Sequence, residues 1–200
     1  MRRMVDEEYG AYGAHTAVKS ELNVKCPKCG GFGIVTAKDG FACLKCTNCG
    51  SVEKKVCMAY QYEVSNRCEK CGHYYKVIIS DIKRQGFSKL NIPCPDCGYV
   101  MLGEVSKKAY DLPCYQAIEN ACEPFFGCEL WFLTYFKSHP VWAVNRDHLN
   151  YLIRYLSADL REKPVGYPFK KQADHLPSFM KSAKNRERIV RLLTKMQMEF

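Results

Sequence analysis

Cysteine is the residue type with the clearest chemical pattern in this sequence. Eight of the 13 cysteines stand in four Cys-x-x-Cys-Gly repeats, which hold Cys26 and Cys29, Cys46 and Cys49, Cys68 and Cys71, and Cys94 and Cys97. Two thiolates at this spacing can bind one Zn²⁺, and the glycine that follows them tolerates the positive φ of a tight turn. Each repeat therefore predicts half of a four-cysteine zinc site.

The gaps between the repeats predict how they pair. Sixteen residues separate the first repeat from the second, and 22 separate the third from the fourth. The usual gap in a zinc ribbon is about 15 to 20 residues. Pairing the first repeat with the second and the third with the fourth predicts two successive ribbons with two structural Zn²⁺ ions. The alternative pairs the first with the third and the second with the fourth, and these longer loops cost more entropy to close.

Four thiolates leave no open position on a metal, so these sites are predicted to hold a fold together and not to catalyse. A redox function is less favoured, because the Cys-x-x-Cys pairs do not begin helices after strands. A disulfide framework is less favoured still, because the cysteine count is odd and no export signal is present. No catalytic residue is predicted.

Five cysteines fall outside this ligand set. Cys43 and Cys46 also have Cys-x-x-Cys spacing, but only the pair of Cys46 and Cys49 is followed by glycine. Cys43 is therefore expected to be a small packed residue, with transient ligand exchange as the alternative. The roles of Cys57, Cys114, Cys122 and Cys128 stay open. For Cys114, Cys122 and Cys128, free buried thiols are expected, and the alternative is a third metal site that also uses His139.

Composition and charge narrow the class of protein. The formal net charge is +9 with cysteine counted as neutral, and two zinc sites of charge −2 each would lower it to +5. No apolar run approaches the roughly 18 residues of a membrane span, and reduced cysteines predict a cytoplasmic location. The sequence contains no metalloprotease, serine-hydrolase or phosphate-loop motif, so an enzyme is the least favoured class.

Positive charge is concentrated near the C-terminus. Residues 161–200 contain ten Lys or Arg and four acids. A helix expected over 177–198 places apolar residues on one stripe and cations on a neighbouring stripe. Such a stripe can contact phosphates, although runs of charge usually form a solvated face. The expected nucleic-acid contacts are Lys181, Lys184, Arg186, Arg188 and Arg191.

Aromatic and basic residues also alternate around the hairpin expected in the second ribbon. Single-strand-binding proteins use such mixtures to stack bases and contact phosphates. The simpler interpretation, which we favour, is that a small ribbon buries these rings beside its zinc. The residues are Tyr74, Tyr75, Lys76, Lys83, Arg84, Phe87 and Lys89.

The elements expected to position these residues are short. They are a strand within 15–25, a hairpin of 33–37 and 41–44 with an Asp39-Gly40 turn, strands over 56–64, 74–82 and 90–93, a transition over 99–128, and strands over 129–136 and 141–144 with a turn at 138–140. Asn145 is expected to cap a helix that carries apolar residues as far as Leu160 and ends before Pro164. Asn185 could restart the final helix.

These patterns predict an α+β protein with two tandem four-cysteine zinc ribbons, followed by a short β-hairpin and C-terminal amphipathic helices. The expected domains are a flexible arm over 1–14, the first ribbon over 15–57, the second ribbon over 58–112, and the hairpin and helices with a basic face over 113–200.

Several longer stretches resemble a family of bacterial zinc-ribbon proteins with a ribbon of the transcription-factor-IIB type. These stretches are Glu123-Pro-Phe-Phe-Gly127, Leu130-Trp-Phe-Leu133, Trp142-Ala-Val-Asn145, His148-Leu-Asn-Tyr-Leu152 and Leu176-Pro-Ser-Phe-Met-Lys-Ser-Ala-Lys-Asn-Arg186. Together with the ribbons they cover most of the chain. The resemblance implies zinc ribbons and no particular reaction.

Two hypotheses about function follow from the sequence. The first is a noncatalytic zinc protein that binds nucleic acid, or another acidic surface in a nucleoprotein complex, through its basic C-terminal helix and ribbon surface. The second is an adapter whose ribbons dock onto a larger protein assembly. Neither membrane binding nor a small-molecule substrate is expected.

Overall fold

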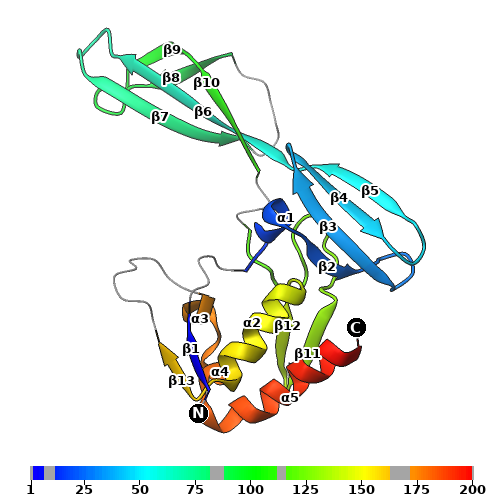
Figure 1. Cartoon of the computed structure of the whole chain (residues 1–200). Coiled ribbons are helices and arrows are strands. Elements are labelled where there is room, and N and C mark those ends of the chain that lie inside the picture. Colours follow the sequence, from blue (N-terminus) through cyan, green and yellow to red (C-terminus); the bar gives the residue numbers. More distant parts are fainter. Residues whose placement is uncertain (1, 7–11, 82–87, 112–115, 163–171, 200) are drawn as a thin grey trace. The chain divides into compact units, whose positions relative to one another are not determined.

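The computed structural model describes residues 2–6, 12–81, 88–111, 116–162 and 172–199. The fold is α+β, as predicted, with small, mainly antiparallel sheets and a long C-terminal helix. The chain divides into two compact units (Figure 1). One contains Met1–Lys55 and Pro113–Phe200, and the other contains Val56–Leu112. The first ribbon therefore belongs to the same unit as the C-terminal hairpin and helices.

The first ribbon is a four-stranded sheet. Its strands, in spatial order, are β2 (Leu22–Lys25), β3 (Phe32–Lys38), β4 (Phe41–Cys46) and β5 (Val52–Val56). Asp39 and Gly40 both have positive φ, 52° and 77°, so the predicted hairpin turn is confirmed. The expected strand within 15–25 is only partly correct, because α1 (Thr16–Lys19) precedes β2 and leaves Val18 half-exposed.

The C-terminal part of this unit packs helices on a β-hairpin. Strands β11 (Phe132–Phe136) and β12 (His139–Ala143) form the hairpin, and α2 (Arg146–Ser157) and α5 (Ala183–Glu199) lie side by side next to it (Figure 1). Short helices α3 (Gln172–His175) and α4 (Ser178–Lys181) precede α5. The core between these elements includes Phe132, Leu149, Leu152, Ile189 and Leu193, which are all nearly inaccessible to solvent.

Helix α2 begins as predicted and ends earlier than predicted. The Asn145 side chain accepts a hydrogen bond from the His148 amide, which caps the helix. The helix stops at Ser157 because Ala158 is extended, with φ −71° and ψ 136°. Leu160 therefore lies in β13 (Leu160–Glu162), which pairs in parallel with β1 (Arg3–Val5). This pairing gives regular structure to part of the expected N-terminal arm, while Pro164 and residues 7–11 lie outside the described residues.

Two other expected boundaries were wrong. Ser182 has ψ 126°, which divides the expected final helix into α4 and α5, and the restart occurs at Ala183, before Asn185. The β11–β12 turn lies one residue earlier than expected, with Lys137 at φ 56° and with Pro140 inside β12. Pro140 is tolerated there because each strand of a two-stranded sheet has an unpaired edge.

The second unit is a small all-β module. Strands β10 (Ser106–Asp111), β6 (Met58–Arg67) and β7 (Tyr74–Asp81) form one sheet in that order, and β8 (Lys89–Pro93) pairs with β9 (Val100–Glu104). Residues 100–111 therefore form strands, where the sequence predicted a transition. The core includes Val64, Tyr75, Ile92 and Met101.

Candidate metal centres and basic helix

The eight predicted ligands form two separate groups of four sulfur atoms. Cys26, Cys29, Cys46 and Cys49 make the first group, and Cys68, Cys71, Cys94 and Cys97 make the second. All four sulfurs of a group lie within 4.8 Å of one another. The first repeat thus lies with the second and the third lies with the fourth, which is the sequential pairing.

The sulfur spacing fits tetrahedral zinc. A Zn–S distance of about 2.3 Å requires tetrahedral S···S distances of about 3.8 Å. The Cys26–Cys49 and Cys29–Cys46 distances are 3.9 and 3.6 Å. In the second group, the Cys68–Cys97 and Cys71–Cys94 distances are 3.5 and 3.7 Å. These distances are far longer than the roughly 2.05 Å of a disulfide, so the two groups fit two structural zinc ions.

The backbone around each repeat holds the sulfurs in place. Gly30, Gly50, Gly72 and Gly98 have φ between 69° and 73°. Amide groups point at the sulfurs, as in the contact of 3.4 Å from Gly31 N to Cys29 Sγ. The predicted role of the glycines is therefore confirmed, because only a left-handed residue reverses the chain at these positions without strain.

The thiols of one group differ in acidity. Hydrogen bonds from the Gly31 amide and the Asn48 side chain lower the pKa of Cys29 to about 6. The Ser51 amide lowers the pKa of Cys49, but hydrogen bonds with neighbouring thiols outweigh it and raise that pKa to about 11. In the second group, the pKa of Cys68 is lowered and that of Cys71 is raised. Zinc binding must therefore displace protons from each site.

The structure adds two neighbours to the second metal centre that the sequence analysis missed. His73 Nδ1 and Asp96 Oδ2 lie 3.4 Å apart, and both side chains are exposed. They form a cluster with Cys71, which already belongs to the four-cysteine group. His73 follows Cys71 by two residues and Asp96 lies between two ligands, so their positions beside the repeats were the available signal.

The other cysteines are divided between buried and half-buried positions. Cys57 and Cys128 are buried, whereas Cys43 and Cys122 are half-buried. Burial, together with the nearby Glu123 carboxylate, raises the pKa of the Cys128 thiol to about 12. None of these four cysteines joins a metal-ligand cluster among the described residues, and Cys114 lies outside them.

Four of the five basic residues of α5 lie on its exposed side. At about 100° per residue, four cations fall within about 60° of one another and roughly opposite the buried residues of the helix. We call this set the basic stripe: Lys184, Arg188, Arg191 and Lys195. All four side chains are exposed, while Ile189 and Leu193 are fully buried. The sequence predicted that the cationic and apolar residues form neighbouring stripes, whereas in the structure the two sets lie on roughly opposite sides of α5.

Two of the five predicted nucleic-acid contacts lie outside the basic stripe. Lys181 is exposed but belongs to α4. Arg186 lies about 160° around the helix from Lys184, on the side that is not exposed. Its guanidinium donates to the Lys181 carbonyl at 3.1 Å, and its Nε is buried. Arg186 is therefore engaged in local structure.

Lys137 is an additional cation next to the basic stripe. It lies in the β11–β12 turn and is exposed, and its Nζ is 5.5 Å from the centre of the Phe136 ring. The Arg188 guanidinium is 5.9 Å from the same ring, so Phe136 contacts both Lys137 and Arg188. No local pattern indicated this shared contact, because 51 positions separate the two residues.

The mixed aromatic and basic residues of the second ribbon occupy several environments. Tyr75 is buried in the core, as favoured, whereas Tyr74 is 66% exposed. Lys76 pairs with Glu63 at 2.7 Å. Lys89 is exposed, and Lys83, Arg84 and Phe87 lie outside the described residues. Among the described aromatic residues of this set, Tyr74 thus presents an exposed ring, whereas Tyr75 does not.

His148 lies in the interior of the first unit. The side chain is 2% exposed, and burial lowers its pKa to about 3. Its Nδ1 accepts a hydrogen bond from the Val144 amide at 3.3 Å, and its ring stacks on Tyr12 at 4.4 Å. These contacts describe a neutral packing residue.

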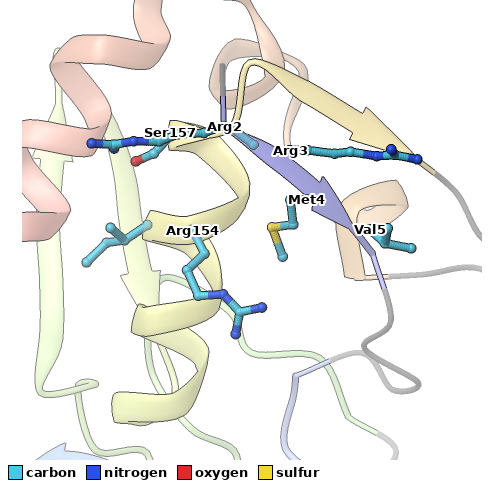
Figure 2. A pocket seen from close by; sticks show the side chains of 8 residues that line it. Arg2, Arg3, Met4, Val5, Arg154 and Ser157 are labelled. Atoms are coloured by element: carbon cyan, nitrogen blue, oxygen red, sulfur yellow. The ribbon is translucent and has the colours of Figure 1, made fainter.

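A hollow of about 470 Å³ lies between β1 and α2 (Figure 2). Its lining includes Arg2, Arg3 and Arg154. In Figure 2 their side chains point in three different directions. Arg3 forms an ion pair with Glu162. The three guanidinium groups therefore do not converge on one ligand position.

Comparison with known proteins adds no functional assignment. No protein-family model, no curated protein and no solved structure matches the chain. The structure itself supports the coarser statement that the protein contains two zinc-ribbon-like modules. Among the described residues, no helix combines the length and the apolar character needed to cross a membrane.

Proposed function

We propose that the protein is a noncatalytic zinc protein that binds nucleic acid with the exposed side of α5. The observation that carries this proposal is the basic stripe of Lys184, Arg188, Arg191 and Lys195. The four-thiolate centres support a structural role for the metal, because they offer no open coordination position. The ribbons then serve as rigid supports, and the chemistry of recognition is contact between cations and phosphates.

The orientation of α5 supports this proposal. Ile189 and Leu193 are buried in the core. Rotating the helix to turn its cations inward would therefore expose these two apolar side chains. The stripe from Lys184 to Lys195 is about 16 Å long, which matches the rise of about five phosphates along one strand of B-DNA. Lys137 widens the same surface at Arg188.

The acids near the stripe form only weak, exposed ion pairs with it. Glu187 pairs with Arg191 at 2.5 Å, and Glu199 pairs with Lys195 at 3.4 Å. These side chains are well exposed, and exposed pairs contribute only about 0 to 1 kcal/mol. A phosphate can therefore replace either carboxylate at little cost.

A charge-reversal experiment tests the proposal. Lys184→Glu combined with Arg188→Glu should abolish binding to a fluorescently labelled 20-nucleotide DNA at low salt. The matched control, Lys19→Glu with Arg154→Glu, makes the same charge change at exposed positions outside the stripe. Equal loss of binding in both variants would show that net charge, and not α5, determines the affinity.

Exposed apolar side chains favour a second candidate function, docking of the second ribbon onto a protein partner. Val100 and Leu102 on β9 are 56% and 59% exposed, and neighbouring Tyr99 is 43% exposed. Neighbouring apolar side chains at the surface often mark protein interfaces. In this case a partner should copurify at high salt, and Leu102→Glu should release it while the α5 double variant should not.

A further inference from the structure

The segment from Glu123 to Cys128 has the backbone of a cysteine repeat without its cysteine pair. The Glu123 amide donates to the Cys128 carbonyl at 2.9 Å, and the Gly127 amide donates to the Glu123 carbonyl at 3.0 Å. Gly127 has φ 76°. These bonds close a tight reversal of the chain that ends on a left-handed glycine.

The first zinc repeat contains the same two bonds at the same spacing. The Cys26 amide donates to the Gly31 carbonyl, and the Gly30 amide donates to the Cys26 carbonyl, both at 2.8 Å. The third and fourth repeats also contain both bonds. In this alignment Glu123 stands where the first cysteine of a repeat stands, and Phe126 stands where the second stands. Proline follows Glu123 just as it follows the first cysteine of the first and fourth repeats.

The Glu123 side chain completes the correspondence. It is 1% exposed, and its carboxylate accepts hydrogen bonds from the amides of Phe125, Phe126 and Cys128 at 2.6, 3.1 and 2.8 Å. These amides lie two, three and five residues after Glu123. They would be left unsatisfied in the interior without an acceptor, at a considerable cost in free energy.

In the zinc repeats, the amides at the equivalent positions point at sulfur. The Cys49 amide, three residues after Cys46, lies 3.4 Å from the Cys46 sulfur. The Gly31 amide, five residues after Cys26, lies 3.4 Å from the Cys29 sulfur. One carboxylate thus accepts the amide hydrogen bonds that two metal-binding sulfurs share in a repeat.

We propose that Glu123–Cys128 is a metal-independent knuckle, in which the buried Glu123 carboxylate replaces the zinc thiolates as the group that holds the turn closed.

The position of this turn gives it a function in the first unit. Beyond the turn, the chain pairs with β2, since the Lys25 amide donates to the Glu129 carbonyl and the Trp131 amide donates to the Asn23 carbonyl, both at 2.8 Å. On the other side, Lys55 Nζ donates to the Phe125 carbonyl at 2.8 Å. The turn thereby joins the first zinc ribbon to the C-terminal hairpin and helices by an anchor that needs no metal.

Hydrogen exchange of the full-length zinc-loaded protein, followed by NMR, tests this proposal. Glu123→Gln replaces one acceptor oxygen with an NH₂ group that faces amide donors. The Phe126 and Cys128 amides should exchange about 10- to 100-fold faster, because charge-assisted hydrogen bonds are lost. The zinc content should stay at two ions per chain. Glu119→Gln, the same change at a nearby exposed position, should alter neither quantity.

The reciprocal variant separates the knuckle from the zinc sites. Cys29→Ser should lower the zinc content while the Phe126 and Cys128 amides keep their protection. If Glu123→Gln leaves these amides protected, or if Cys29→Ser exposes them equally, the proposal is wrong. If Glu123→Gln does not fold, Glu123→Asp provides the test. It keeps the charge on a shorter side chain, so it should fold with two zinc ions and faster exchange, and unchanged exchange would refute the carboxylate's role.

Discussion

Neutralising part of the basic stripe should change how steeply nucleic-acid binding depends on salt. Each phosphate contact contributes about −0.9 to the slope of log K against log[salt] on B-DNA. Four contacts predict a slope of about −3.6, so raising the salt from about 50 to 200 mM should weaken binding roughly 150-fold. The double variant Lys184→Gln/Arg188→Gln retains two of the contacts. Its slope should be about −1.8, and the same change in salt should weaken its binding only about 12-fold.

Fluorescence anisotropy with a labelled DNA duplex at five or six salt concentrations measures both slopes. Arg186→Gln is the matched control, because it removes one charge from the same helix at a position turned away from the stripe. Its slope should remain near that of the unaltered protein. Circular dichroism and zinc content would verify that each variant is folded. If Arg186→Gln makes the slope shallower by about 0.9, the change expected for one lost contact, the assignment of the contacts to the exposed side of α5 is wrong.

Three further predictions concern the metal sites and the cores. Cys29→Ser should reduce the zinc content from two ions to one per chain by elemental analysis, whereas Cys43→Ser should leave two; loss of metal in both would place Cys43 in the ligand set. Gly103→Ala should destabilise the second unit by about 1 to 3 kcal/mol in urea unfolding, because the new methyl overlaps the Val64 side chain. Val64→Ala should partly rescue that variant, and additive losses would contradict the overlap. Because the pKa of His148 is lowered to about 3, the unfolded chain binds more protons below about pH 6.5, and stability should fall by about 2 kcal/mol from pH 6.5 to 5. His148→Gln should remove this part of the pH dependence, and an unchanged profile would show that the buried imidazole is not its source.

Local spacing was enough to predict several features of this protein. A Cys-x-x-Cys-Gly repeat closes on itself, so the four turns and their left-handed glycines follow from a few neighbouring residues. The Asp39-Gly40 turn and the Asn145 cap were predictable for the same reason, since each depends on one or two side chains and the adjacent backbone.

Other features depend on residues far apart in the chain. Leu160 continues the apolar pattern of α2, but pairing with β1 places it in a strand. Arg186 is one of a run of cations, yet the side of α5 that faces the core removes it from the basic stripe. The restart of the final helix was expected at Asn185 and occurs at Ala183, because the apolar pattern continues through Ser182 and does not mark the break.

Residue type and short spacing were enough to predict the ligand set, two zinc centres and a basic C-terminal helix. The fold was needed to show which cations share one exposed side of α5, and that Glu123 stands in the position of a cysteine. A buried carboxylate is stabilised by amides that the folded backbone brings to it, and no pattern of residue types records where those amides will point.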